Sequence, residues 1–133
     1  MKLLLKLTVM MAVSLASCAA YAEVVVIVSA KSTATTMTSS EIANIYLGKS
    51  TAMKPVDNAT PIRAQFYTAV AGKDAAQVKA IWSKLVFTGK ATPPKELATS
   101  SEVVKAVAAD PNAIGYIDKA SVDGTVKVVY DIK

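Results

Sequence analysis

The run Glu23-Val24-Val25-Val26-Ile27-Val28 decides the fold of this chain. Its apolar residues are β-branched and do not alternate with polar ones, which indicates a strand buried on both faces. A strand of this kind belongs to a parallel or mixed sheet. We therefore expect an α/β domain in which a mixed sheet is flanked by helices.

Four helices are expected downstream of this strand. The first begins at a capping box formed by Thr38 and Glu41, and the third at one formed by Asp74 and Gln77. The fourth is expected from about Ser101 to Ala109. Their apolar residues recur at helical spacing, so each helix has one face for the core. Phe66 and Trp82 lie on these stripes and are predicted to be core residues.

The second helix is expected to begin at Thr60-Pro61. Threonine is a good N-cap, and proline suits the first helical position because its missing N–H would go unpaired there. Further strands are predicted near Val56, at Ile114–Asp118 and at Thr125–Ile132. The segment Ala91–Ala98 is predicted to be a loop because it contains Pro93-Pro94.

The first 22 residues have the pattern of a signal peptide. A positive segment, Lys2–Lys6, precedes the apolar segment Leu7–Ala16, which is shorter than the ~20 residues that span a bilayer. Cleavage after Ala20-Tyr21-Ala22 would leave residues 23–133 as one periplasmic domain. Leu15-Ala16-Ser17-Cys18 also resembles a bacterial lipobox, in which Cys18 would be lipidated and would anchor the protein to a membrane. Both alternatives predict export.

The composition excludes several kinds of chemistry. The chain has no histidine, and its one cysteine, Cys18, lies in the predicted leader. The mature chain therefore lacks the residues for a Ser-His-Asp triad, a Cys-His dyad, a zinc site or an iron–sulfur cluster. No carboxylate spacing suggests acid–base work or a metal site, so we expect neither an enzyme nor a cofactor. The formal charge of +5 includes two leader lysines, and the mild remainder argues against a nucleic-acid partner.

An ordered set of motifs gives a resemblance to a known family. The stretch Met37–Lys49 resembles the Leu-Ser/Thr-x-x-Glu-Leu-x-x-Ile-Phe-x-Gly-Lys stretch of phosphate-type periplasmic solute-binding proteins. Asn112–Ile117 resembles the Gly-Ala-Ile-Gly-Tyr-Val segment of the same family. Phe87-Thr88-Gly89 and Val104–Val107 lie between them in the expected order. The resemblance covers nearly all of residues 23–132.

The resemblance implies one lobe of a type 2 periplasmic-binding fold. Full members have two α/β lobes that clamp the ligand, whereas this chain has the length of one lobe and motifs that correspond to the second. The implied function is an exported module that binds phosphate or a related oxyanion for an ABC-type uptake system. A lone lobe would bind weakly, bind at a homodimer interface or present the anion to a partner.

The ligand motif departs from that family and leaves a second function open. Full members open a helix with Ser-Gly-Thr, whereas this chain has Ala59-Thr60-Pro61, which keeps one hydroxyl and lacks one N–H. The alternative is therefore a non-transport protein that has lost ligand binding. It would contact an envelope protein or a sensor instead.

Thr60 and Arg63 are the first candidate ligand residues. Unpaired N–H groups and the helix dipole attract anions to a helix N-terminus. Arg63 is the only arginine and falls in that first turn, where a cation opposes the dipole. An anion bound between Arg63 and the free N–H groups would turn the free-energy cost of this unfavourable charge position into a favourable interaction. The alternative is an ordinary helix start in which Arg63 pairs with a carboxylate such as Asp57.

The loop after the first strand supplies the other candidates, Ser29, Ser32 and Thr33. Ligands of open α/β sheets bind beyond the carboxyl ends of strands, and these residues offer hydroxyl and N–H groups. The alternative is a solvated polar connection. Tyr116 either edges a pocket or is a core tyrosine whose hydroxyl reaches a partner.

Overall fold

Strands and helices alternate through residues 23–132, the part of the chain that the computed structural model describes. The strands are β1 (Val24–Ser29), β2 (Lys54–Asn58), β3 (Lys95–Leu97), β4 (Ala113–Asp118) and β5 (Val126–Ile132). The helices are α1 (Ser39–Tyr46), α2 (Ile62–Ala71), α3 (Ala75–Phe87), α4 (Ser100–Ala109) and the short 3₁₀ helix η1 (Lys119–Ser121). The predicted leader, including Cys18, lies outside the described residues.

The five strands form one sheet in the order β3-β2-β4-β1-β5. β2 runs parallel to β3 and β4, whereas β1 runs antiparallel to both of its neighbours, β4 and β5. The predicted mixed sheet is confirmed. It follows that β2, β3, β4 and β5 end at one edge of the sheet and that β1 ends at the opposite edge.

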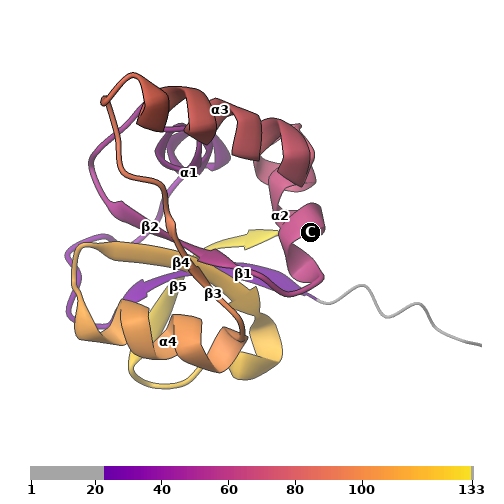
Figure 1. Ribbon diagram of the computed structural model, residues 1–133. Helices are drawn as coiled ribbons and strands as arrows, with labels where there is room; N and C mark the ends of the chain where they lie inside the picture. Colours follow the sequence, from indigo (N-terminus) through magenta and orange to yellow (C-terminus); the bar gives the residue numbers. More distant parts are fainter. Residues whose placement is uncertain (1–22, 133) are drawn as a thin grey trace, which may run out of the picture.

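β1 is buried along its whole length, as its sequence predicts. Val24, Val26 and Val28 pack into the core beneath α1, α2 and α3, whereas Val25 and Ile27 pack into the core beneath α4. Figure 1 shows the three helices on one face of the sheet and α4 on the other. Alternate side chains of a strand point to opposite faces, so a strand covered on both sides needs apolar residues throughout.

Local signals set the starts of α1 and α3. Thr38 and Glu41 form the predicted capping box, and so do Asp74 and Gln77. Phe66 and Trp82 are buried, also as predicted.

The prediction that Thr60 caps α2 is wrong. The N-cap position is taken by Pro61 in a helical conformation, and no side chain of residues 23–132 caps the start of the helix. The Asn58 side chain instead accepts a hydrogen bond from the Thr60 backbone N–H, at 3.2 Å. This local turn fixes Thr60 before the helix begins, so its hydroxyl does not reach the first helical N–H groups.

The loop predicted at Ala91–Ala98 contains a strand. Lys95–Leu97 pairs in parallel with Val56–Asn58 of β2. β3 has only three residues and is the outermost strand of the sheet. Its extended conformation is therefore determined by pairing with β2, because the segment has no apolar pattern of its own. Pro93-Pro94 precedes the pairing and does not interrupt it.

Candidate functional site

The turn from β2 into α2, residues 57–63, lies at the edge where four strands end. Asn58 holds this turn from beneath and is fully buried. Its side-chain amide donates to the Tyr116 carbonyl at 3.0 Å and to the Ser100 hydroxyl at 3.1 Å, while its oxygen accepts from Thr60. These bonds tie the turn to β4 and to the start of α4. We call residues 57–63 the β2–α2 junction.

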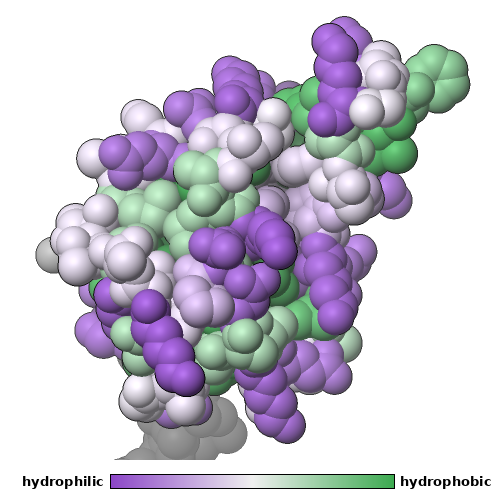
Figure 2. Space-filling model, turned by 90° about the vertical axis from the view of Figure 1, so that its left-hand side faces the viewer, coloured by the Kyte–Doolittle hydropathy of each residue, from purple (hydrophilic) through white to green (hydrophobic). Residues whose placement is uncertain are grey.

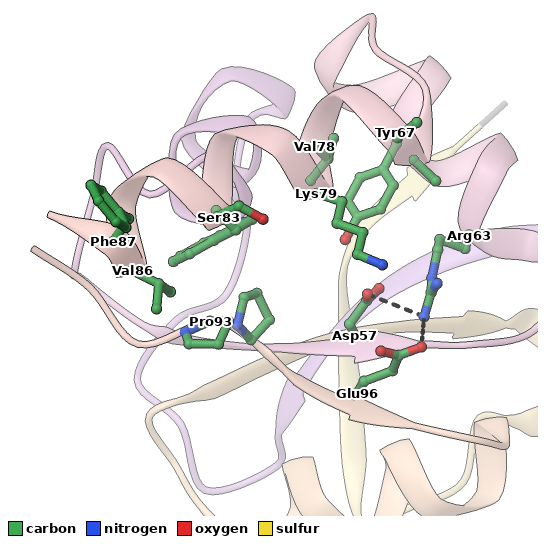
Figure 3. Close-up of a pocket in the computed structure, with 14 residues that line it drawn as sticks. Asp57, Arg63, Tyr67, Val78, Lys79, Ser83, Val86, Phe87, Pro93 and Glu96 are labelled. Carbon is green, nitrogen blue, oxygen red and sulfur yellow. Dashed lines mark hydrogen bonds and ion pairs between the residues drawn. The ribbon is translucent and has the colours of Figure 1, made fainter. Parts of the chain in front are cut away.

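Arg63 lies in this junction between two carboxylates. Its guanidinium is 3.3 Å from Asp57 Oδ2 and 2.5 Å from Glu96 Oε1 (Figure 3). The hydrogen bond and charge of Arg63 hold the pKa of Glu96 below its ordinary value. Asp57 is largely buried, whereas the Glu96 side chain is 60% exposed. The pairing of Arg63 with Asp57, the structural alternative for this arginine, is therefore present.

Tyr116 fixes the Asp57 carboxylate from the core side. Its hydroxyl donates to Asp57 and accepts from the Asn58 backbone N–H at 3.2 Å. Burial, reinforced by the Asp57 charge, raises the pKa of Tyr116 and of Tyr67. Both phenols therefore stay neutral near pH 7. Tyr116 is fully buried, which confirms the prediction of a core tyrosine whose hydroxyl reaches a partner.

Two donors of the junction have no acceptor. The Thr60 hydroxyl and the Arg63 Nε are buried and have no hydrogen-bond partner among the described residues. A buried donor without a partner costs about 1–3 kcal/mol. An oxygen-rich anion at the start of α2 would supply acceptors for both, and for the N–H groups of the first helical turn.

The other predicted site residues lie far from this junction. Ser29 ends β1 beside Val126, and its buried hydroxyl donates to the Ala108 carbonyl at 3.3 Å. The Ser32 hydroxyl accepts from the Ala34 N–H, and Thr33 is exposed. Because β1 runs antiparallel to β4, this loop and the junction lie at opposite edges of the sheet, separated by about the length of a strand. The structure does not bring the two sets of candidates together.

A pocket of about 710 Å³ adjoins the junction. Asp57, Arg63 and Glu96 lie at one end, and α3 and the segment that leads into β3 form its sides (Figure 3). Glu96, within the segment predicted to be a loop, and Lys79, an exposed residue of α3, also line this pocket. Nothing local in the sequence links either residue to Arg63. The small and apolar residues along α3 are the available signal for the pocket, but at helical spacing they indicate core packing.

Two negative findings apply to residues 23–132. No helix within them is long and apolar enough to cross a membrane. They also contain no group of three or more His, Cys, Asp or Glu side chains arranged to hold a metal ion.

Comparison with known proteins gives matches in structure alone. No protein-family model matches the sequence, and no curated protein matches it significantly. Similar solved structures include a putative phosphate ABC transporter substrate-binding protein with bound phosphate from Clostridium perfringens, with a TM-score of 0.66 and 22% identity. An ABC-type phosphate transport receptor from Vibrio cholerae has a TM-score of 0.64 and 17% identity. PstS from Borrelia burgdorferi has a TM-score of 0.59 and 13% identity.

Each match covers 80% of this chain but only 44–46% of the other protein. The chain thus spans less than half the length of the structures it matches. The chain therefore has the fold of a single lobe of the phosphate ABC transporter binding proteins.

Proposed function

We propose that this protein is an exported oxyanion-binding module, with phosphate as its ligand, that is associated with an ABC-type phosphate uptake system. One observation carries the proposal: the buried Thr60 hydroxyl and Arg63 Nε, where α2 begins, have no acceptor within residues 23–132. The fold supports it, since the similar Clostridium perfringens protein was solved with bound phosphate.

The anion would lie at the β2–α2 junction and bond to Arg63 and Thr60. Charge-assisted hydrogen bonds from a guanidinium to a phosphate are among the strong ones. Asp57 stays in place because Tyr116 holds it, and it orients Arg63. The exposed Glu96 carboxylate would leave Arg63 as the anion arrives. The affinity would be modest, because a single lobe cannot enclose the ion and Pro61 offers no N–H.

The predicted leader places this function in the periplasm, with lipidation at Cys18 as the alternative route to the envelope. The mass of the protein isolated from its host distinguishes the two. A chain that begins at Glu23 supports a free periplasmic protein, and a diacylated chain that begins at Cys18 supports a membrane-anchored one.

Calorimetric titration with phosphate tests the binding site. We expect saturable heat and, for Arg63→Gln, an affinity at least tenfold weaker, because a charge-assisted hydrogen bond is worth about 1.5–3 kcal/mol. Lys31→Gln is the matched control, since it removes one positive charge at the opposite edge of the sheet. Unchanged affinity in a folded Arg63→Gln variant contradicts the assignment.

An envelope interaction protein is the second candidate function. Phe87 is 91% exposed at the end of α3, and its neighbour Val86 is also exposed. Large apolar side chains gathered on a surface mark places where partners bind. No heat with phosphate up to millimolar concentration, from a protein with intact secondary structure, would favour this candidate over the first.

A further inference from the structure

The pocket beside Arg63 is larger and more apolar than an inorganic ion requires. Its volume of about 710 Å³ falls in the range of roughly 300–1,000 Å³ that holds small organic ligands. Nine of its fourteen lining residues are apolar or aromatic. A site for phosphate alone needs only a few polar donors around one ion, so the apolar lining of this pocket requires another explanation.

One end of the pocket is charged and suits an anionic group. Arg63 and Lys79 both line it, and the Lys79 ammonium points toward Asp57 and Arg63 (Figure 3). Lys79 makes no ion pair or hydrogen bond with any other residue in the range 23–132, and Arg63 keeps one buried donor without an acceptor. Asp57 is occupied by Tyr116 and Arg63, so Glu96 is the one carboxylate that must move.

The other end of the pocket is apolar. Tyr67, Val78 and Trp82 line the side next to the core, and all three are at least nine-tenths buried. Val86, Phe87 and Pro93 lie at the end remote from Arg63 (Figure 3). Figure 2 shows hydrophobic surface between hydrophilic side chains on one face of the molecule. An organic group that occupied this end would remove apolar surface from water.

The geometry points to a phosphate monoester with an aromatic or branched apolar substituent as the ligand of this pocket, its phosphoryl group on Arg63 and Lys79 and its organic group against Trp82. This inference rests on the proposed function, because it keeps the oxyanion at the β2–α2 junction. It adds that the ester binds more tightly than the free ion. Burial of about 60 Å² of a phenyl ring corresponds to roughly tenfold tighter binding.

Phenyl phosphate, inorganic phosphate and phenol are the three probes of this inference. Trp82 is the only tryptophan in the chain and lies in the pocket wall, so its fluorescence reports occupancy directly. Calorimetry with the same protein supplies the affinities. We expect phenyl phosphate to bind about tenfold more tightly than phosphate, to change the Trp82 emission, and to bind far more tightly than phenol.

Two exposed positions on α3 provide a matched pair of variants. Ser83 lines the pocket between Lys79 and the apolar end (Figure 3), whereas Ala80 does not line it, so added bulk at either position leaves the core intact. Ser83→Phe should abolish the tenfold preference for phenyl phosphate without changing the affinity for inorganic phosphate. Ala80→Phe should change neither affinity.

The contrary outcomes distinguish failure of this inference from failure of the proposed function. Equal affinities for phenyl phosphate and phosphate overturn this inference and leave the proposed function standing. The same holds if phenol binds as tightly as phenyl phosphate, or if Ser83→Phe and Ala80→Phe behave alike. Absence of binding by both phosphate and phenyl phosphate overturns the proposed function together with this inference.

Discussion

Replacement of Glu96 by glutamine should strengthen phosphate binding. Glu96 Oε1 lies 2.5 Å from the guanidinium of Arg63, so an incoming anion must displace it. Glutamine keeps the shape of the side chain and a hydrogen-bonding oxygen, but it removes the competing charge. The variant therefore tests whether Arg63 is the anion's partner.

The size of the effect follows from the exposure of Glu96. Its side chain is 60% exposed, and pairs of this kind contribute about 0.2–1 kcal/mol. The displaced Glu96 carboxylate also repels the bound anion. At a separation of ~7 Å in water this repulsion is about 0.6 kcal/mol for each negative charge of the anion, before salt screening. Together these terms amount to ~1 kcal/mol, which corresponds to roughly fivefold tighter binding.

Calorimetry at low and at moderate salt measures this change. The gain should shrink as salt is added, because the interactions removed are largely solvent-screened. Asp123→Asn is the control: it removes one negative charge near the start of β5, at the opposite edge of the sheet, and should leave the affinity unchanged. If Glu96→Gln binds phosphate no more tightly than the unchanged protein, the anion does not displace Glu96 from Arg63.

Three further predictions concern stability and pH. Gly115→Ala should destabilise the fold by about 1–3 kcal/mol in urea titrations, because the new Cβ would lie 2.7 and 2.9 Å from two valine side chains of α4. At Gly124 a new Cβ would meet no atom of residues 23–132 within 4 Å, so Gly124→Ala should be nearly neutral. Sulfate, which stays divalent in acid, should bind more tightly as pH falls through the lowered pKa of Glu96, because protonated Glu96 no longer competes for Arg63. The stability that the Glu96–Arg63 pair contributes is lost over the same pH range. A sulfate affinity that does not vary with pH contradicts this prediction. Burial raises the pKa of three tyrosines above the ordinary 10.0, so the stability they contribute is present below pH 10 and is lost at higher pH. These tyrosines are Tyr46, Tyr67 and Tyr116. Alkaline difference absorbance should show their phenols ionising only when the protein unfolds, and their ionisation in the folded protein would contradict this prediction.

The sequence predicted the parts of the fold that depend on local patterns. The unbroken apolar run of β1 can exist only in a sheet covered on both faces, and the Thr38–Glu41 spacing places the start of α1 without reference to the rest of the chain. β3 depends on its partner instead. Its three residues have no strand pattern of their own, and β2 determines their conformation.

The candidate site was only partly predictable for the same reason. Arg63 and Asp57 are six positions apart, so their pairing could be anticipated. Glu96 and Lys79 come from β3 and α3, and only the tertiary fold brings them to Arg63. The tendency of ligands to bind where strands end favours the loop at Ser29, but a run of valines carries no information on strand direction. β1 proved antiparallel, which places that loop at the opposite edge.

Backbone amide shifts in an NMR titration with phosphate report directly whether the anion binds at the β2–α2 junction. We expect saturable shifts at Thr60, Ile62 and Arg63, with one dissociation constant that matches calorimetry, and no shift at Ser32 or Thr33. Shifts confined to the loop after β1, or no saturable shifts at the β2–α2 junction in millimolar phosphate, would contradict it.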